Sequence, residues 1–379
     1  MSKPVYGKNF RLGILGGGQL GRMLIQEAIS LDIDVHVLDP APDAPCANIA
    51  ASFTCGDFRD FQTVMQFAEN MDVVTIEIED VSVPALRELR QKGIKVFPDP
   101  DILEIIKDKG LQKEFYAKHG IPTSDFSIIS GSADIRQEQL PIVQKLRTGG
   151  YDGKGVLVLK SPEDLNKAFD APSVLEDCVD IAKELSVIIS RNELGQSATF
   201  PVVEMVFDER SNLVDYLFAP AMISVDVANQ ACQLATRVAD AFNFVGILAV
   251  EMFLTHSGDI LVNEIAPRTH NSGHHSIEGN VTSQFGQHLR AVLGLPPGST
   301  ATLRPAAMVN LVGEPGYSGK VIYQGLEEVL AMEGVYPHFY GKSETKPFRK
   351  MGHVTIIANS VDELADKVHL VKNTIKVIA

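Results

Sequence analysis

Two carboxylates, Glu251 and Glu264, each interrupt an apolar run, and a short turn separates the two runs. The runs ILAVEMFL and DILVNEIA are rich in Val, Ile and Leu, and THSGD supplies turn residues, so this region predicts a β-hairpin. Buried carboxylates are unfavourable unless they are neutralised, and a pair without a basic neighbour in the sequence indicates a bound cation. Oxygen ligands suit Mg²⁺, which is usually shared with substrate phosphates. The alternative is two acids facing water, but Asn263 beside Glu264 adds a third oxygen ligand.

The bulk composition excludes several classes of protein. A chain of 379 residues can form two or three domains. Its net charge of −14 and the absence of a basic tract argue against a nucleic-acid partner. No apolar signal region or run of membrane length is present, so we expect no membrane association. The four cysteines form no CxxC pair, which is typical of reduced thiols in a cytoplasmic protein.

The order of apolar segments predicts the domain organisation. Strands and helices alternate from residue 10 to about 99, which indicates a doubly wound α/β unit that ends at the prolines of FPDPD. One continuous helix is expected from Ile102 to His119, because Gly120 and Pro122 follow it. The later segments are expected to be short strands around a glycine-rich loop (124–160), antiparallel strands (173–222), a long amphipathic helix (225–243) and a small α+β unit over about the last eighty residues.

The first glycine-rich segment matches a dinucleotide fingerprint. Gly16, Gly18 and Gly21 form GxGxxG between a predicted strand and a predicted helix, and Asp39 ends the next strand. Such a turn lets a phosphate approach backbone N–H groups at a helix N-terminus. An anion site is therefore expected here, and an NAD-binding dehydrogenase is one alternative, although no hydride-transfer site is evident elsewhere in the chain.

A second glycine-rich segment, Thr148 to Gly155, contains four glycines between two predicted strands. Its backbone N–H groups could close over phosphates, with Lys145, Arg147 and Lys154 adding positive charge. It lacks the GKS or GKT of a P-loop, and a flexible hairpin tip is the alternative. We expect a nucleotide lid.

Two further polar segments are candidates for substrate contacts. The run from Arg268 to His275 contains three histidines, but no cysteine lies near and adjacent His274 and His275 would point apart on an extended chain, so a hydrogen-bonding wall is favoured over zinc. Near the C-terminus, a basic cluster is expected to be either a solvated loop or a phosphate clamp. The cluster consists of Lys342, Lys346, Arg349 and Lys350.

Seven strings follow one another in a fixed order along almost the whole chain. They are GILGGGQLGRM at 13–23, TIEIEDV at 75–81, RTGGYDGKG at 147–155, AVEMF at 249–253, NEIAPRTHNSGHH at 263–275, TSQFGQHLRAVLGLP at 282–296 and RKMGHVTI at 349–356. Together they resemble the ATP-grasp superfamily and, within it, the 5-(carboxyamino)imidazole ribonucleotide synthetases of purine biosynthesis.

The resemblance implies a mixed α/β and α+β architecture in three domains. These are a Rossmann-like domain at 1–99, an ATP-grasp module at 100–296 with a small lid subdomain at about 124–178, and a C-terminal α+β domain at 297–379. It also implies a cytoplasmic ligase, with a tendency of the family to form dimers. The activity implied is ATP-dependent carboxylation of the exocyclic amine of 5-aminoimidazole ribonucleotide by bicarbonate, through carboxyphosphate.

The resemblance also assigns roles to individual residues. Those implied to bind ATP are Lys109 and Lys145 at the phosphates, Gly150, Tyr151, Asp152, Gly153, Lys154, Gly155 and Val156 in the lid, Glu176, Asp177, Cys178 and Val179 at the adenine, Glu184 at the ribose, and Asn263 beside the nucleotide. Glu251 and Glu264 would bind Mg²⁺. Those implied to face the ribonucleotide and bicarbonate are Gln19, Leu20, Glu77, Lys346 and Arg349, with Tyr151, Lys154, Arg268 and His270 as the catalytic set.

The sequence departs from the family pattern at a few positions. Phe207 stands where the family usually has a histidine near the nucleotide, so packing would replace a polar contact. Asp80 replaces the commoner Asn, and Thr269 the commoner Pro. Lys346 replaces the commoner Arg and would lose bidentate phosphate geometry. Another ATP-grasp ligase with a different acceptor amine and a non-catalytic nucleotide-binding protein are the remaining alternatives.

Overall fold

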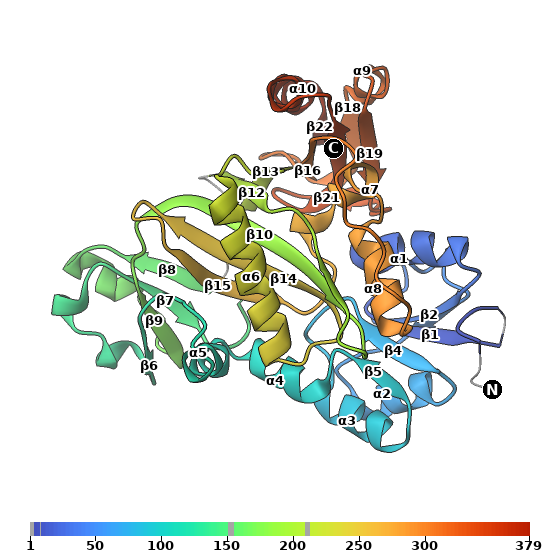
Figure 1. Cartoon of the computed structure of the whole chain (residues 1–379), viewed down its shortest axis with the longest axis horizontal. Coiled ribbons are helices and arrows are strands. Elements are labelled where there is room, and N and C mark those ends of the chain that lie inside the picture. The colour runs from blue at the N-terminus through green and yellow to red at the C-terminus, as the bar shows by residue number, and fades with distance from the viewer. Residues whose placement is uncertain (1–3, 8, 151–154, 209–212) are drawn as a thin grey trace.

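The computed structural model describes residues 4–7, 9–150, 155–208 and 213–379 (Figure 1). The N-terminal part is a parallel five-stranded sheet, which confirms the predicted doubly wound α/β unit. Strands such as RLGIL are almost continuously apolar because both faces of a parallel sheet are covered. In spatial order the strands are β3 (Ser52–Cys55), β2 (Asp34–Asp39), β1 (Arg11–Leu15), β4 (Val73–Ile76) and β5 (Lys95–Phe97). The helices of this part are α1 (Gln19–Ser30), α2 (Phe61–Ala68) and α3 (Val83–Gln91).

The single helix expected from Ile102 to His119 is wrong. The chain forms two helices instead, α4 (Pro100–Lys107) and α5 (Lys109–Lys118). Asp108 between them has extended backbone angles, and its carboxylate accepts hydrogen bonds from the N–H groups of Gly110 (2.8 Å) and Leu111 (3.2 Å). An aspartate N-cap of this kind satisfies donors that a continuous helix would have bonded internally, so the capping residue starts a second helix.

A small antiparallel sheet carries the second glycine-rich segment. Its strands, in spatial order, are β6 (Phe126–Ile129), β9 (Ser173–Asp177), β7 (Ile142–Leu146) and β8 (Val156–Leu159). Three short 3₁₀ helices, η1 (Ser132–Asp134), η2 (Gln137–Gln139) and η3 (Pro162–Lys167), join them. At the base of the glycine segment, Gly155 has a φ of +76° and a Cβ added there would lie 3.2 Å from the Cα of Gly150, so a side chain is excluded.

The largest sheet is antiparallel and has nine strands. In spatial order, eight of them are β15 (Ile260–Ala266), β14 (Gly246–Thr255), β10 (Ile181–Arg191), β12 (Val203–Asp208), β13 (Leu213–Ala219), β16 (Ala306–Val312), β21 (Lys350–Ile357) and β19 (Val335–Phe339), and β11 (Ser197–Thr199) pairs with β10. The helix α6 (Val225–Ala241) covers one face (Figure 1). Its buried residues Ala231, Leu234, Ala235 and Val238 follow the helical repeat, as an amphipathic helix requires.

The C-terminal segment adds strands to this same sheet. Strand β16 pairs with β13 of the central part, so the sheet runs without a break past residue 297. The remaining elements confirm the predicted α+β character: α9 (Leu326–Leu330), α10 (Val361–Thr374), and the pairs β17 (Gly319–Lys320) with β20 (Glu344–Thr345) and β18 (Ile322–Gln324) with β22 (Lys376–Ile378). No helix in the described ranges combines the length and the apolar character needed to span a membrane.

Three helical elements follow the acidic hairpin along the chain: η4 (Asn271–Gly273), α7 (Ser276–Gly279) and α8 (Gln284–Val292). Helix α8 lies beside α1 in Figure 1, and Phe285 and Leu289 of α8 share one buried apolar cluster with Leu20 and Leu24 of α1. The segment that follows the acidic hairpin is therefore fixed to the helix that begins at the first glycine loop.

Candidate active site

The two acids of the hairpin are direct neighbours. Strands β14 and β15 pair antiparallel with Glu251 opposite Glu264, which confirms the predicted hairpin. Lys109, the first residue of α5, places its Nζ 2.5 Å from Oε2 of Glu264. This ammonium lowers the pKa of Glu264, whereas burial and the charge of Glu264 raise the pKa of Glu251. The structure therefore holds one carboxylate paired with a lysine and one whose burial and acidic neighbour favour the protonated form.

A buried ion cluster lies next to the acid pair. Nζ of Lys145 on β7 lies 3.0 Å from the Glu176 carboxylate and donates to Oδ1 of Asn263 at 2.8 Å. Nζ of Lys113 lies 3.1 Å from the same carboxylate, and Ser124 also donates to it at 2.6 Å. Although burial opposes ionisation, Lys145 and Lys113 lower the pKa of Glu176.

Lys113 has no counterpart among the residues predicted from the sequence. It follows Lys109 by four positions on α5, so both ammonium groups lie on one face of the helix, and this spacing was the available signal. Burial lowers the pKa of Lys113 to about 8. The side chain of Glu176 is occupied by these two lysines, so any contact it makes with an adenine would come from its backbone.

The remaining residues expected at the nucleotide surround this cluster. Asp177 ends β9. Of the two residues that follow it, Cys178 is exposed and Val179 is half-buried. Glu184 lies on β10, where burial raises its pKa to about 7. Phe207 on β12 packs against a small apolar cluster that includes Met205, so packing occupies the position where the family pattern has a histidine.

The first glycine loop faces a carboxylate. The N–H of Leu20, in the first turn of α1, donates to Oε1 of Glu77 at 3.1 Å, and a Cβ added at Gly18 would lie 2.5 Å from that oxygen. Asp39 accepts the N–H of Gly17 at 2.7 Å and so holds the loop itself. Burial raises the pKa of Glu77 to about 7. Because a pyrophosphate here would meet this carboxylate, the geometry disfavours the dinucleotide alternative. Gln19 and Leu20 begin α1 directly beside Glu77.

Within the 268–275 segment, Arg268 and His270 lie next to glutamates. Nε of Arg268 lies 3.0 Å from Glu79, and Nε2 of His270 lies 3.5 Å from Oε1 of Glu251. His274 and His275 are each 1% exposed and bond inside the protein. The expectation that the whole segment forms a substrate wall is therefore wrong for these two histidines, because the chain coils into η4 and turns them into the core.

The second glycine loop is tied down at its base. Arg147, expected to supply charge to a phosphate, instead forms a bidentate pair with Asp108 at 2.8 and 2.7 Å. Gly150, Gly155 and Val156 are described at the ends of the loop, whereas Tyr151, Asp152, Gly153 and Lys154 lie outside the described residues.

The residues of the basic cluster near the C-terminus differ in their distance from the acidic hairpin. Lys346 is exposed, and a guanidinium nitrogen of Arg349 donates to the carbonyl of Glu344 at 2.7 Å. Lys350 lies close enough to the hairpin that its charge acts to lower the pKa of Glu251, although burial prevails. The C-terminal part thus brings positive charge to the acid pair.

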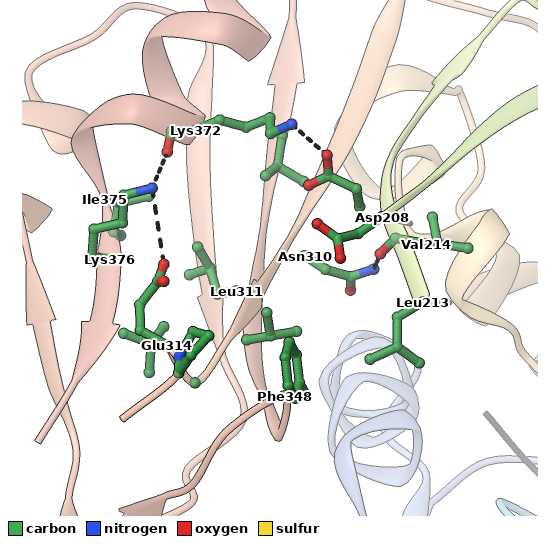
Figure 2. Close-up of a pocket in the computed structure, with 16 residues that line it drawn as sticks. Asp208, Leu213, Val214, Asn310, Leu311, Glu314, Phe348, Lys372, Ile375 and Lys376 are labelled. Carbon is green, nitrogen blue, oxygen red and sulfur yellow. Dashed lines mark hydrogen bonds and ion pairs between the residues drawn. The ribbon is translucent and has the colours of Figure 1, made fainter. Parts of the chain in front are cut away.

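A separate cavity of about 160 Å³ lies where β13 and β16 diverge (Figure 2). The amide nitrogen of Asn310 reaches across the gap to the carbonyl of Val214 at 2.7 Å, and Lys372 contacts Asp215 at the rim. None of the residues expected at the active site lines this cavity, so it is distinct from the acid pair.

Comparisons with known proteins match all three parts of the chain. Residues 10–107 match the ribonucleotide synthetase preATP-grasp domain, residues 114–285 the ATP-grasp domain, and residues 306–367 the phosphoribosylaminoimidazole carboxylase C-terminal domain. The N5-carboxyaminoimidazole ribonucleotide synthase of Bacillus subtilis is 37% identical, with 96% of this chain and 95% of that protein covered.

Solved structures of the same kind of enzyme match the fold of almost the whole chain. The N5-carboxyaminoimidazole ribonucleotide synthetase of Thermotoga maritima is 45% identical, covers 98% of this chain and 99% of its own, and has a TM-score of 0.91. The Aspergillus clavatus N5-carboxyaminoimidazole synthase, solved with ADP and 5-aminoimidazole ribonucleotide, is 33% identical, covers 96% and 98%, and has a TM-score of 0.87. The chain belongs to the N5-carboxyaminoimidazole ribonucleotide synthase family of ATP-grasp ligases.

Proposed function

We propose that this protein carboxylates the exocyclic amine of 5-aminoimidazole ribonucleotide with bicarbonate, using ATP, and thereby acts in purine biosynthesis. The observation that carries the proposal is the meeting of two groups of residues at the acidic hairpin. Lys109 and the Lys145–Asn263 pair approach it from the ATP-grasp side, and His270 approaches it from the side of the first glycine loop. A triphosphate and a second substrate could therefore meet at one place.

On the nucleotide side, Lys109 and Lys145 would bind the phosphates, with Gly150, Gly155, Val156 and the four residues between 150 and 155 closing over them. The chain after β9, from Glu176 to Val179, would present backbone groups to the adenine, and Glu184 would accept the ribose hydroxyls. In support, Lys109 and Lys145 approach from different elements, α5 and β7, and both side chains turn toward the hairpin.

Glu251 and Glu264 fit a divalent ion shared with those phosphates. The described residues contain no group of three or more His, Cys, Asp or Glu arranged to hold a metal. Mg²⁺ does not need one, because it uses one or two carboxylates and takes its other oxygens from water and phosphates. Burial and the charge of Glu264 raise the pKa of Glu251, and a bound cation would favour its ionised form. When bound, Mg²⁺ would offset negative charge on the transferring phosphoryl group.

The chemistry proceeds in two steps. A bicarbonate oxygen attacks the γ-phosphorus, the bond to the ADP oxygen breaks, and carboxyphosphate forms. Loss of phosphate then gives CO₂, whose carbon accepts the amine lone pair as the nitrogen releases a proton. Lysines that neutralise charge and a lid that excludes water are what this reaction needs, because phosphoryl transfer depends on electrostatics and carboxyphosphate hydrolyses readily.

On the other side, Gln19, Leu20, Glu77, Lys346 and Arg349 would bind the ribonucleotide. Arg268, His270, Tyr151 and Lys154 would hold bicarbonate and the amine. Anchoring the ribose phosphate far from the reacting nitrogen would position the amine against short-lived CO₂. This assignment is supported by the location of Glu77, Arg268 and His270 around one end of α1 and the hairpin.

Release of ADP with bicarbonate, measured with and without 5-aminoimidazole ribonucleotide, tests the proposal. We expect the ribonucleotide to stimulate release strongly. Stimulation by another amine instead would identify a different ATP-grasp ligase, and no release with any amine would favour a nucleotide-binding protein without catalysis. A large thermal stabilisation by NAD would support the dehydrogenase alternative.

We further propose domain boundaries near residues 99 and 296, a homodimeric state and a cytoplasmic location. The boundary near 296 lies between the second and third family matches, at 114–285 and 306–367, whereas the first match extends past 99 to residue 107. Size-exclusion chromatography with light scattering would test the dimer, for which a single species of about 41.2 kDa would be the contrary result.

A further inference from the structure

Gln284, the first residue of α8, forms hydrogen bonds with both backbone polar groups of His270. Its Oε1 accepts the His270 N–H at 2.8 Å, and its Nε2 donates to the His270 carbonyl at 2.7 Å. The side chain is fully buried, at 0% exposure. One amide thus pairs with both polar groups of one residue, an arrangement that fixes the position of that residue and also the orientation of the amide.

The same amide defines the state of a neighbouring histidine. Nε2 of Gln284 also lies 2.9 Å from Nδ1 of His274. Because the bonds to His270 fix which end of the amide is nitrogen, Nδ1 must accept this bond, and His274 is neutral with its proton on Nε2. Burial also lowers the pKa of His274, so both the hydrogen bond from Gln284 and the burial favour the neutral imidazole.

The surroundings of Gln284 are shaped to hold it in place. A Cβ added at Gly273 would lie 2.4 Å from Oε1 of Gln284, so the chain at this position has room only for glycine. The N–H of Gln284 donates to Ser276 at 2.9 Å. Ser283 caps α8 by accepting the N–H of Gly286 at 3.0 Å, and its hydroxyl donates to Glu27 of α1. Gln284 therefore connects His270 to the helix that starts at the first glycine loop.

We propose that Gln284 is a positioning residue that holds His270 in the geometry required for carboxylation. The inference rests on the proposed function of the site. The ring of His270 is held at Nδ1 by Ser272 at 2.9 Å and approaches Glu251 with Nε2. Gln284 bonds both the N–H and the carbonyl of His270, and that carbonyl also accepts the N–H of Gly273 at 3.0 Å. Loss of that hold would shift the imidazole relative to both substrates.

The chain offers a matched control on the same helix. Gln287 is also fully buried, and it makes the same pair of bonds, at 2.6 and 3.0 Å, to the backbone of Gly298, which has no role in the proposed site. Gln284→Met and Gln287→Met each remove both bonds to the backbone of one residue with little change in volume, and Gln284→Met also removes the bond to His274. A difference in kcat, compared with the loss of thermal stability in each variant, therefore reports on position relative to the site.

Steady-state kinetics of ADP release with saturating ribonucleotide, together with thermal unfolding, test the proposal. We expect a loss of thermal stability in both variants, larger in Gln284→Met by the bond to His274, and a kcat that falls about 10–100-fold more in Gln284→Met, with the KM for ATP unchanged within about twofold. In a His270→Ala background, Gln284→Met should lower kcat no further, since it acts through His270. Gly273→Ala should reproduce the kcat loss by displacing Gln284, which keeps the test available if Gln284→Met does not fold.

Equal kcat values for Gln284→Met and Gln287→Met, or full additivity with His270→Ala, would overturn the proposal. These outcomes are distinct from failure of the proposed function. That failure would be visible in the unaltered protein as an absence of ribonucleotide-dependent ADP release.

Discussion

Asp108 joins two parts of the nucleotide side, and its replacement by asparagine should have a measurable cost. The carboxylate both caps α5 and forms a bidentate pair with Arg147, at the base of the second glycine loop. Asparagine caps helices as well as aspartate does, so the substitution isolates the charged pair. The two side chains are only 28% and 19% exposed, so solvent screening is limited, and hydrogen bonds to charged groups contribute about 1.5–3 kcal/mol.

The free energy lost with the Asp108–Arg147 pair can be converted into a change in melting temperature. For 379 residues that unfold together, an unfolding entropy of about 2.1 cal/mol/K per residue gives about 0.8 kcal/mol/K, so Asp108→Asn should lower Tm by about 2–4 °C. The KM for ATP should also rise, because the N–H of Lys109 donates to the Arg147 carbonyl at 2.9 Å and the pair fixes the start of α5.

Differential scanning calorimetry with a matched variant tests this reasoning. Asp60 caps α2 by accepting the N–H of Thr63 at 2.7 Å, but no lysine or arginine among the described side chains bonds to it. Asp60→Asn should therefore change Tm little. A Tm for Asp108→Asn equal to that for Asp60→Asn would show that the Arg147 pair contributes nothing, and the coupling of loop and helix would have to be abandoned.

Three further predictions concern the site itself. Glu264→Gln should reduce ATP turnover on the order of 10²-fold or more with little loss of secondary structure by circular dichroism, and near-normal turnover would remove the metal assignment. Glu77 has a raised pKa of about 7, so the native state binds more protons than the unfolded state between about pH 4.5 and 7 and its ionisation destabilises the protein as pH rises. Glu77→Gln should therefore gain stability relative to the unaltered protein from pH 5 to 8, by up to about 3 kcal/mol in thermal or urea unfolding, and a pH-independent difference would contradict the burial of its charge. Arg349→Ala should raise the KM for the ribonucleotide and leave that for ATP unchanged, whereas an unchanged ribonucleotide KM would make this residue part of a surface loop.

The sequence was sufficient for the hairpin and for most elements because their apolar repeats are long. Strands β14 and β15 pair where the alternating Val, Ile and Leu predict them, and Glu251 faces Glu264 as a result. The break at Asp108 was missed because α4 and α5 share a continuous helical pattern. An aspartate within a helical pattern can serve as an N-cap, but propensity alone does not separate that use from an ordinary surface position.

Partners that are distant in sequence account for what could not be predicted. Lys113 precedes Glu176 by 63 positions, and the sequence around either residue does not predict that the two form an ion pair. Arg147 lies among glycines and was expected to face a phosphate, yet its guanidinium matches the geometry of the Asp108 carboxylate. His274 and His275 are buried, and His274 lies against Phe285 of α8 and His353 of β21, residues from two elements that follow later in the chain.

The first glycine loop shows why a motif needs its tertiary surroundings. The GxGxxG spacing describes a tight turn that leads into a helix N-terminus, and both are present at Gly16 to Gly21. The identity of the ligand is decided by what stands opposite that terminus. Here a half-buried carboxylate, Glu77, already accepts a hydrogen bond from the first turn of α1, so an anion such as a pyrophosphate would meet an acceptor and not a donor at this position. A neutral or cationic part of a substrate, such as an amine or a hydroxyl, would instead gain an acceptor, which is why the same turn is better suited to the body of a ribonucleotide than to a dinucleotide.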